Sequence, residues 1–177
     1  NGGAYGYYMD LATSAVTSIL MISDNSFENQ TNSGISLLHS GGGGTFTHAM
    51  IVDNMFANQP KAINLGSSGS WLSLVTISGN SISGTAAGST ALITLTNAPR
   101  SVIKGNNLNG VGTATVGITV GSGSTSCEIG PNLIAGCVTD VTNAATNSIA
   151  SANALVIPSG IDVVQITGNT QINSINL

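Results

Sequence analysis

Short segments of alternating apolar and polar residues recur along the chain at a nearly constant interval. Each segment carries an isoleucine three residues before an asparagine and an apolar residue two residues after it. The asparagines are Asn25, Asn54, Asn80, Asn106 and Asn132, separated by 29, 26, 26 and 26 residues. An outlying copy of the segment ends at Asn169. A fixed period in the twenties is typical of a repeat architecture.

Each segment predicts a short strand that leads into a turn. Apolar or small residues occupy the fifth and third positions before the asparagine, and mixed residues stand between them, as expected for a strand with one face inside. The fifth positions are Leu20, Ala49, Val75, Ser101 and Cys127. The residue just before the asparagine is Asp24, Asp53, Gly79, Gly105 or Pro131. These are turn residues, and Gly and Asp tolerate a positive φ.

A second apolar strand follows each turn, and Gly- and Ser-rich links join the strands. Its apolar pairs are Ile35 and Leu37, Ile63 and Leu65, Ile93 and Leu95, Ile118 and Val120, and Val138 and Val141. No stretch shows helical periodicity, and a repeat of 26 residues without a crossover helix cannot form a βαβ unit. Such a repeat can wind as one coil of a solenoid, with successive coils stacked at the ~4.8 Å spacing of parallel strands.

Stacked coils place identical columns of residues above one another. The isoleucines then form an internal aliphatic stack. The asparagines form a ladder whose side-chain amides bond between coils, as stacked Asn does in cross-β structures. The predicted fold is all-β: a parallel β-helix of about five coils over residues 1–147, followed by a connector and an extended C-terminal β segment over residues 148–177.

The coil length and the I-x-G/D-N-x-F/I/L turn of residues 16–147 resemble the right-handed, single-stranded parallel β-helix proteins of the pectate-lyase-like superfamily. That group includes polysaccharide lyases, glycoside hydrolases and bacteriophage tailspikes. Both features are specific for the fold and silent on the activity, and the right hand is implied by the resemblance. Residues 155–175 resemble a segment that follows the β-helix in many phage tail and tailspike-like proteins. Because an open solenoid end exposes unpaired backbone groups, we expect the natural protein to continue beyond both ends or a partner to cover them.

Composition narrows the class of protein. Only 6% of the residues are charged, and the formal net charge is −4. The basic residues are Lys61, Arg100 and Lys104, too few to neutralise a run of phosphates, which argues against nucleic acid as a partner. No run approaches the ~20 apolar residues of a membrane helix, so we expect no membrane insertion. Cys127 and Cys137 predict two small, partly buried thiols without a zinc site, and we expect no metal or cofactor.

Asp24 and Asp53 are the first candidates for chemistry. They occupy one column in adjacent coils, so their side chains would start ~5 Å apart, near the separation of a retaining carboxylate pair. The alternative is that aspartate serves here as a turn residue, in the column where glycine stands in the next two coils. Glu28, four residues after Asp24, is either an acid partner or a solvated turn residue.

Two histidines and several aromatic residues are candidates for glycan binding. His39 and His48 bracket a glycine-rich insertion in the one 29-residue coil, where they could bind a glycan or a metal, although a metal site needs more ligands. Trp71 follows a Ser/Gly loop and either stacks on a sugar or packs in the core or an oligomer interface. The other aromatic candidates for sugar stacking are Tyr5, Tyr7 and Tyr8.

The enzymes of the superfamily carry motifs that this chain lacks. Pectate lyases bind calcium with clustered Asp ligands beside an Arg base, and no such cluster is present. Polygalacturonase-like hydrolases carry N-x-D, D-D, G-H and R-x-K motifs, and residues 100–104 have the wrong spacing for the last of these. No catalytic motif is found, and a catalytic site could lie in coils outside this sequence.

The residues leave three functional hypotheses open. The first is a structural and host-surface-glycan-binding part of a phage tailspike or tail fibre, located in the virion, with bacterial surface polysaccharide as its partner. Sparse charge and the semi-apolar outward positions Met50, Val52 and Val102 favour side-by-side packing, and tailspikes of the resembled family are homotrimers. The second is a polysaccharide-degrading enzyme, a glycoside hydrolase or lyase, with an acidic groove. The third is a secreted adhesin without catalysis.

Overall fold

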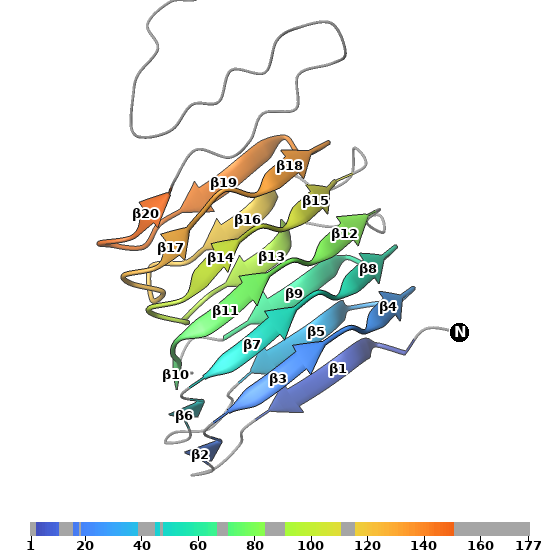
Figure 1. Ribbon diagram of the computed structural model, residues 1–177, viewed down its shortest axis with the longest axis horizontal. Coiled ribbons are helices and arrows are strands. Elements are labelled where there is room, and N and C mark those ends of the chain that lie inside the picture. The colour runs from blue at the N-terminus through green and yellow to red at the C-terminus, as the bar shows by residue number, and fades with distance from the viewer. Residues whose placement is uncertain are drawn as a thin grey trace, which may run out of the picture.

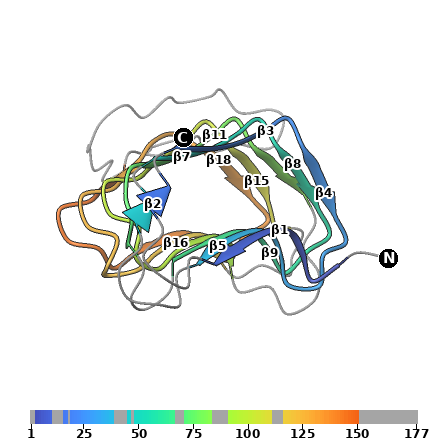
Figure 2. The same cartoon turned by 90° about the horizontal axis from the view of Figure 1, so that it is seen from below.

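We describe the fold from a computed structural model that defines residues 3–10, 16–17, 19–38, 45–46, 48–66, 71–83, 91–110 and 116–150. Within these ranges every regular element is a β-strand, and the strands form parallel sheets. The predicted all-β parallel solenoid is therefore confirmed. Its strands stack in the order of the chain (Figure 1) and enclose one interior (Figure 2).

Three long sheets run the length of the stack, and a fourth, short one fills a corner. Sheet A contains β1 (Tyr5–Asp10), β5 (Ser33–Leu38), β9 (Lys61–Leu65), β13 (Ala91–Leu95), β16 (Val116–Val120) and β19 (Thr139–Asn143). Sheet B contains β2 (Val16–Thr17), β6 (Thr45–Phe46) and β10 (Trp71–Leu72). Sheet C contains β3 (Leu20–Ser23), β7 (Ala49–Val52), β11 (Val75–Ser78), β14 (Val102–Lys104), β17 (Glu128–Ile129) and β20 (Ile149–Ala150). Sheet D contains β4 (Ser26–Glu28), β8 (Met55–Ala57), β12 (Ser81–Ser83), β15 (Asn107–Asn109) and β18 (Leu133–Ala135).

The isoleucine column fixes the register of sheet C. The stacked side chains are Ile22, Ile51, Ile77, Ile103 and Ile129, each at most 5% exposed. The apolar pairs of β5, β9, β13 and β16 stack in the same way across sheet A and are fully buried. A one-residue slip would turn either column outward, so the sequence period sets the stacking. The five asparagine-bearing coils enclose about four full turns.

The predicted asparagine ladder is confirmed at the turn between sheets C and D. Asn54, Asn80, Asn106 and Asn132 are at most 2% exposed, whereas Asn25 at the end of the ladder is exposed. The Asn80 Oδ1 accepts hydrogen bonds from the backbone N–H and the Nδ2 of Asn54, at 3.0 and 3.1 Å. The Asn80 Nδ2 donates to Ile51 O at 2.9 Å, to Ser78 O at 3.1 Å and to Asn106 Oδ1 at 2.9 Å. The amides of Asn54, Asn80 and Asn106 therefore each link three consecutive coils.

Residue sizes on sheet A match those on sheet D across the interior. A Cβ on Gly34 would lie 2.5 Å from Phe56 Cδ1 and 2.9 Å from the carbonyl oxygen of Ala62, and a Cβ on Gly6 would overlap the ring of Phe27. The two phenylalanines stack on each other, with centroids 5.2 Å apart and planes inclined by 22°. Glycine is therefore required at these two positions because a phenylalanine fills the space above each.

The last coil departs from the predicted pattern. Val138 was expected inside with Val141, but β19 begins one residue later and Val138 is 82% exposed. Val141 pairs instead with Ile118, the place predicted for Val138, and Asn143 takes the place opposite Val120 that was predicted for Val141. Because Asn143 is polar, this last strand has only one apolar residue, Val141, to pack against the core. Beyond this coil, β20 still pairs with β17. The predicted C-terminal β segment lies outside the described residues, and the boundary at residue 147 stays a prediction.

Candidate functional site

Asp24 and Asp53 lie at the turn between sheets C and D, and both are exposed. The register of β3 and β7 sets them side by side in adjacent coils. Their φ angles of 59° and 55° are left-handed, and Gly79 and Gly105 continue the column at 68° and 67°. Aspartate tolerates this conformation because its short side chain bonds locally. The backbone therefore gives both aspartates a turn role, whatever chemistry their carboxylates perform.

Glu28 ends β4, on the far side of the same turn, and is exposed. Ser26 Oγ lies 3.5 Å from Glu28 Oε1, a long hydrogen bond. In the register of β4 and β8 the neighbour of Glu28 is Ala57. No described residue adds a second carboxylate to the column of Glu28, so the strand pairing brings it no acid partner.

The corner that leads into sheet C carries two of the predicted glycan-binding residues. His48 is exposed and immediately precedes β7, where its carbonyl oxygen accepts a hydrogen bond from Leu20 N at 2.9 Å. Trp71 begins β10 and pairs with Thr45 of β6. His48 and Trp71 thus lie in neighbouring coils near the same corner, with Trp71 opposite a residue three positions before His48. His39 lies outside the described residues, so its pairing with His48 stays a prediction.

The two cysteines are free thiols, as the sequence predicts. Cys127 is buried, and its Sγ donates to Ser124 O at 3.0 Å and to Ala98 O at 3.3 Å. Burial raises the pKa of Cys127, and burial followed by the Asp140 carboxylate raises the pKa of Cys137. Both thiols therefore stay protonated at neutral pH and are poor nucleophiles. Within the described ranges no three His, Cys, Asp or Glu side chains gather to hold a metal ion.

A shallow hollow opens at the end of the stack formed by β1, β3 and β4. Its lining includes Tyr7, Met21 and Phe27, and none of the three carboxylate candidates. The hollow is the open end of the interior rather than a groove along the side of the solenoid. This hollow is therefore not the acidic groove that the enzyme hypothesis expects.

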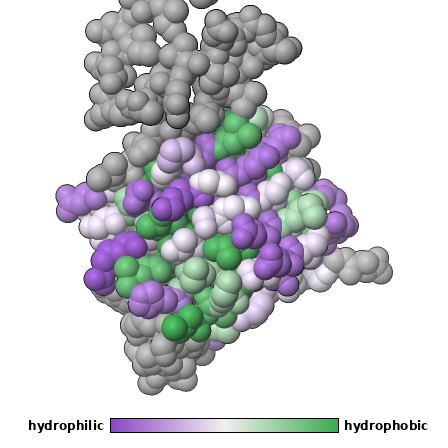
Figure 3. All heavy atoms as spheres, viewed as in Figure 1, coloured by the Kyte–Doolittle hydropathy of each residue, from purple (hydrophilic) through white to green (hydrophobic). Residues whose placement is uncertain are grey.

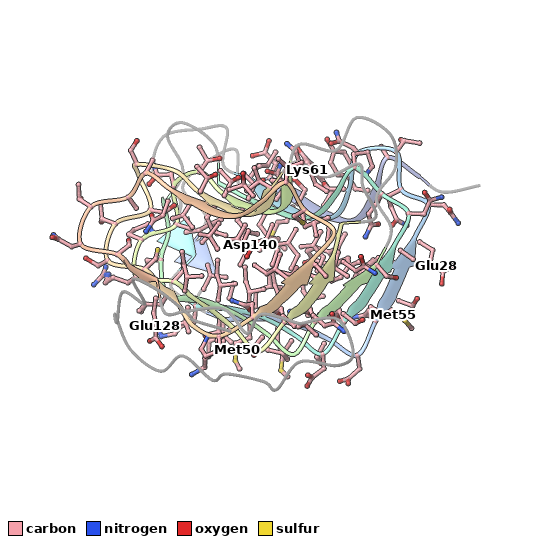
Figure 4. All side chains as sticks on the ribbon, turned by 90° about the horizontal axis from the view of Figure 1, so that it is seen from above. Glu28, Met50, Met55, Lys61, Glu128 and Asp140 are labelled. Atoms are coloured by element: carbon pink, nitrogen blue, oxygen red, sulfur yellow. The ribbon has the colours of Figure 1, made fainter. Side chains whose placement is uncertain are left out.

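The outer surface of sheet C is apolar over its first coils. Met21 and Met50 are register neighbours and are 60% and 40% exposed. Ile19 before β3 is 72% exposed, and Met55 at the start of β8 is 53% exposed. Figure 3 shows apolar side chains on this face, and Figure 4 shows Met50 and Met55 outside the tube. A row of large apolar side chains in water is typical of an interaction surface.

The outer surface of sheet A gathers residues that spacing alone did not connect. Tyr5 and Tyr8 are three residues apart, and a regular strand would place them on opposite faces. Gly6 and Tyr7 instead both face the interior, which is a kink in the regular alternation, and the two rings lie 4.6 Å apart. Tyr7 packs against the core and does not join them. The sequence signal for this kink is the glycine repeated at the matching position of β5.

Comparison of the chain with protein-family models, with curated proteins and with solved structures finds no match to any of them. The superfamily suggested by the coil length and the turn therefore stays a prediction, while the parallel solenoid itself is established. A search of the described residues for a helix long and apolar enough to span a membrane finds none.

Proposed function

We propose that this chain is a structural and glycan-binding part of a phage tailspike or tail fibre, extracellular in the virion, in which three copies pack side by side. The observation that carries the proposal is the apolar row of Ile19, Met21 and Met50 along the outside of a hydrogen-bonded solenoid. A stack in which every coil bonds to the next is a stiff rod. Such a rod suits a protein that projects from a particle toward a bacterial surface.

The surface charge agrees with side-by-side packing. Only 6% of the residues are charged, so parallel copies in register bring few like charges together. One outward column of sheet C holds Met21, Met50, Thr76, Val102 and Glu128. The first four are uncharged, so the column carries no charge until Glu128. Burying the methionines of three copies against one another removes apolar surface from water, at about 25 cal/mol per Å².

The wild-type chain should sediment as a trimer. The double substitution Met21→Asp and Met50→Asp should yield monomers, because the like charges would be buried in the interface. Both side chains are at least 40% exposed in the single chain, so the monomer should keep its fold and its circular dichroism spectrum. Thr142→Asp, on the exposed outer side of sheet A, is the matched control and should stay trimeric. Sedimentation velocity of the wild type as a stable monomer would contradict the packing proposal.

The glycan-binding half of the proposal has its own test. Immobilised capsular and O-antigen polysaccharides purified from a panel of bacteria are presented to the trimer in biolayer interferometry. We expect saturable binding to at least one of them. A folded trimer that binds none of the panel would contradict the glycan-binding role.

The second candidate function is a polysaccharide-degrading enzyme, and the neighbouring exposed carboxylates of Asp24 and Asp53 favour it. Coil stacking starts their side chains ~5 Å apart, which is the spacing of a retaining pair. If they are the catalysts, Asp24→Asn and Asp53→Asn should each lower the release of reducing ends by 10³-fold or more (about 4 kcal/mol). If they are turn residues, both variants should act like the wild type, because Asn also tolerates a positive φ.

A further inference from the structure

Tyr5 and Tyr8 form an aromatic pair on the outside of sheet A. Their ring centroids are 4.6 Å apart with planes inclined by 39°, and Tyr8 is 48% exposed. Asn32 in the next coil donates from Nδ2 to the Tyr5 Oη at 2.7 Å. This bond anchors the Tyr5 ring to the second coil, and the Tyr8 ring lies against it as the more exposed member of the pair.

Polar groups frame the tyrosine pair. The Tyr8 hydroxyl donates to Asp10 Oδ2 at 3.3 Å. Partial desolvation and then the Asp10 carboxylate raise the pKa of Tyr8, so its ring stays a neutral phenol in ordinary buffers. Two coils further along the same columns stand Lys61 and Asn64, both partly exposed. Figure 4 shows Lys61 on the outer side of the tube.

Two serine hydroxyls lie between the tyrosines and this second polar row. In the register Ser33 stands between Tyr5 and Lys61, and Ser36 stands between Tyr8 and Asn64. Both serines are 0% exposed, and neither Oγ has a hydrogen-bond partner. A buried hydroxyl without a partner is unfavourable. Features that cost stability, such as a buried hydroxyl without a partner, are concentrated at functional sites in proteins.

We propose that this strip of sheet A, from Tyr5 and Tyr8 to Lys61 and Asn64, is the subsite that binds neutral pyranose units of the glycan. The apolar C–H face of one sugar ring stacks on the Tyr8 ring. When Tyr8 turns to accommodate that ring, sugar hydroxyls supply the missing partner of Ser36. Asn64 and Lys61 donate to the second sugar unit along the chain, two coil spacings or ~10 Å from the first. This inference rests on the proposed glycan-binding function.

The charges on the strip favour a neutral glycan over an anionic one. Lys61 is the one cation among the described residues of sheet A, and Asp10 lies beside the aromatic pair. A polyanion would meet the Asp10 carboxylate next to the stacking ring, whereas neutral hydroxyls can both donate to Asp10 and accept from Lys61. The mixed donor and acceptor set therefore matches the chemistry of sugar hydroxyls.

The test uses the full chain and the same immobilised polysaccharide panel. Tyr8→Ala should weaken binding to the polysaccharide that the wild type binds by about 10-fold, because the stacking surface is lost. Tyr8→Phe keeps the ring and should retain the affinity within about twofold. Thr142→Ala, in the same outward column at the far end of sheet A, should bind like the wild type.

Ser36→Ala separates a ligand contact from a structural role. It removes a buried hydroxyl without a partner, so the melting temperature should rise by about 3 °C while the affinity falls by about fivefold. Wild-type affinity in both Tyr8→Ala and Ser36→Ala would overturn this subsite and leave the glycan-binding function intact. Absence of binding by the wild-type trimer itself would overturn the function and the subsite together.

Discussion

Replacing Asn80 with aspartate should destabilise the solenoid by about 4 kcal/mol at pH 7, because three acceptors surround the atom that changes. The Asn80 Nδ2 faces Ile51 O, Ser78 O and Asn106 Oδ1 at 2.9 to 3.1 Å. A carboxylate oxygen in its place repels all three and is 1% exposed, so water cannot compensate. The second carboxylate oxygen replaces the Asn80 Oδ1 and still accepts the hydrogen bonds from Asn54. The substitution therefore removes only the three bonds that the Asn80 Nδ2 donates.

The penalty in Asn80→Asp should depend on pH. Burial and the surrounding acceptors favour the protonated carboxyl, so its folded pKa lies above the unfolded value of about 3.9. The difference from the wild type is therefore small below the unfolded pKa. It grows as the pH rises from the unfolded pKa through the folded pKa, because the unfolded carboxyl has lost its proton and folding must either take up a proton or bury the charge. Urea unfolding of both proteins at pH 4 and pH 7 measures this difference.

Asn25 provides the matched control at the exposed end of the ladder. Its Nδ2 donates to Ser23 O at 2.7 Å and to Asn54 Oδ1 at 3.2 Å, but solvent reaches the side chain. Asn25→Asp should therefore lower the unfolding free energy by about 1 kcal/mol or less. Equal destabilisation of the two variants would show that the interior ladder adds nothing beyond a turn preference.

The inward columns could be predicted because each coil repeats the same physical requirement. An isoleucine slipped outward or an asparagine without its neighbour would cost several kcal/mol, so the sequence keeps both in every coil. A further column of residues with positive φ, just before the strands of sheet C, could not be predicted in this way, because its residue type differs from coil to coil. Leu74, Arg100, Ser126 and Asn147 have φ angles of 56° to 60° before or near the strands of sheet C. Three of these residue types rarely adopt this conformation, and bonds such as Leu74 N to Pro99 O, at 3.1 Å, hold it in place.

The tyrosine strip could not be predicted because it depends on a kink and on contacts between coils. Alternation places Tyr5 and Tyr8 on opposite faces, and only the packing of Gly6 against Phe27 reverses this. Ser33 and Ser36 are placed between the tyrosines and the Lys61–Asn64 row only by the register of three coils. By contrast, Asp24 and Asp53 could be paired from spacing alone, because they occupy the repeating turn itself.

Gly34→Ala should destabilise the protein by about 3 kcal/mol, since the added methyl group has no room to move. Its Cβ would lie 2.5 and 2.8 Å from two ring atoms of Phe56 and 2.9 Å from Ala62 O. The ring is fully buried and stacked on Phe27, and the carbonyl belongs to the strand ladder, so neither neighbour can shift freely. Gly105→Ala is the control, because its Cβ meets only Gly79 N, at 4.0 Å. The control should lose about 1 kcal/mol, from its positive φ alone.

The next coil shows how the same space is filled with a larger strand residue and a smaller partner. Ala62 is the register neighbour of Gly34, and Ile82 is the register neighbour of Phe56. Gly34→Ala combined with Phe56→Ile should therefore reproduce the Ala62 and Ile82 arrangement one coil earlier. Phe56→Ile alone leaves a cavity and loses the stacking on Phe27, so we expect it to cost about 2 kcal/mol.

In a double-mutant cycle the combined variant should be more stable than the sum of the two single losses by about 1–2 kcal/mol. The lost stacking on Phe27 appears in both the single and the double variant, so it cancels from the coupling energy. Guanidinium unfolding of the four proteins measures the term. Additive losses would mean that Gly34 is needed for its backbone alone, and that size matching between sheets A and D does not select residues along this solenoid.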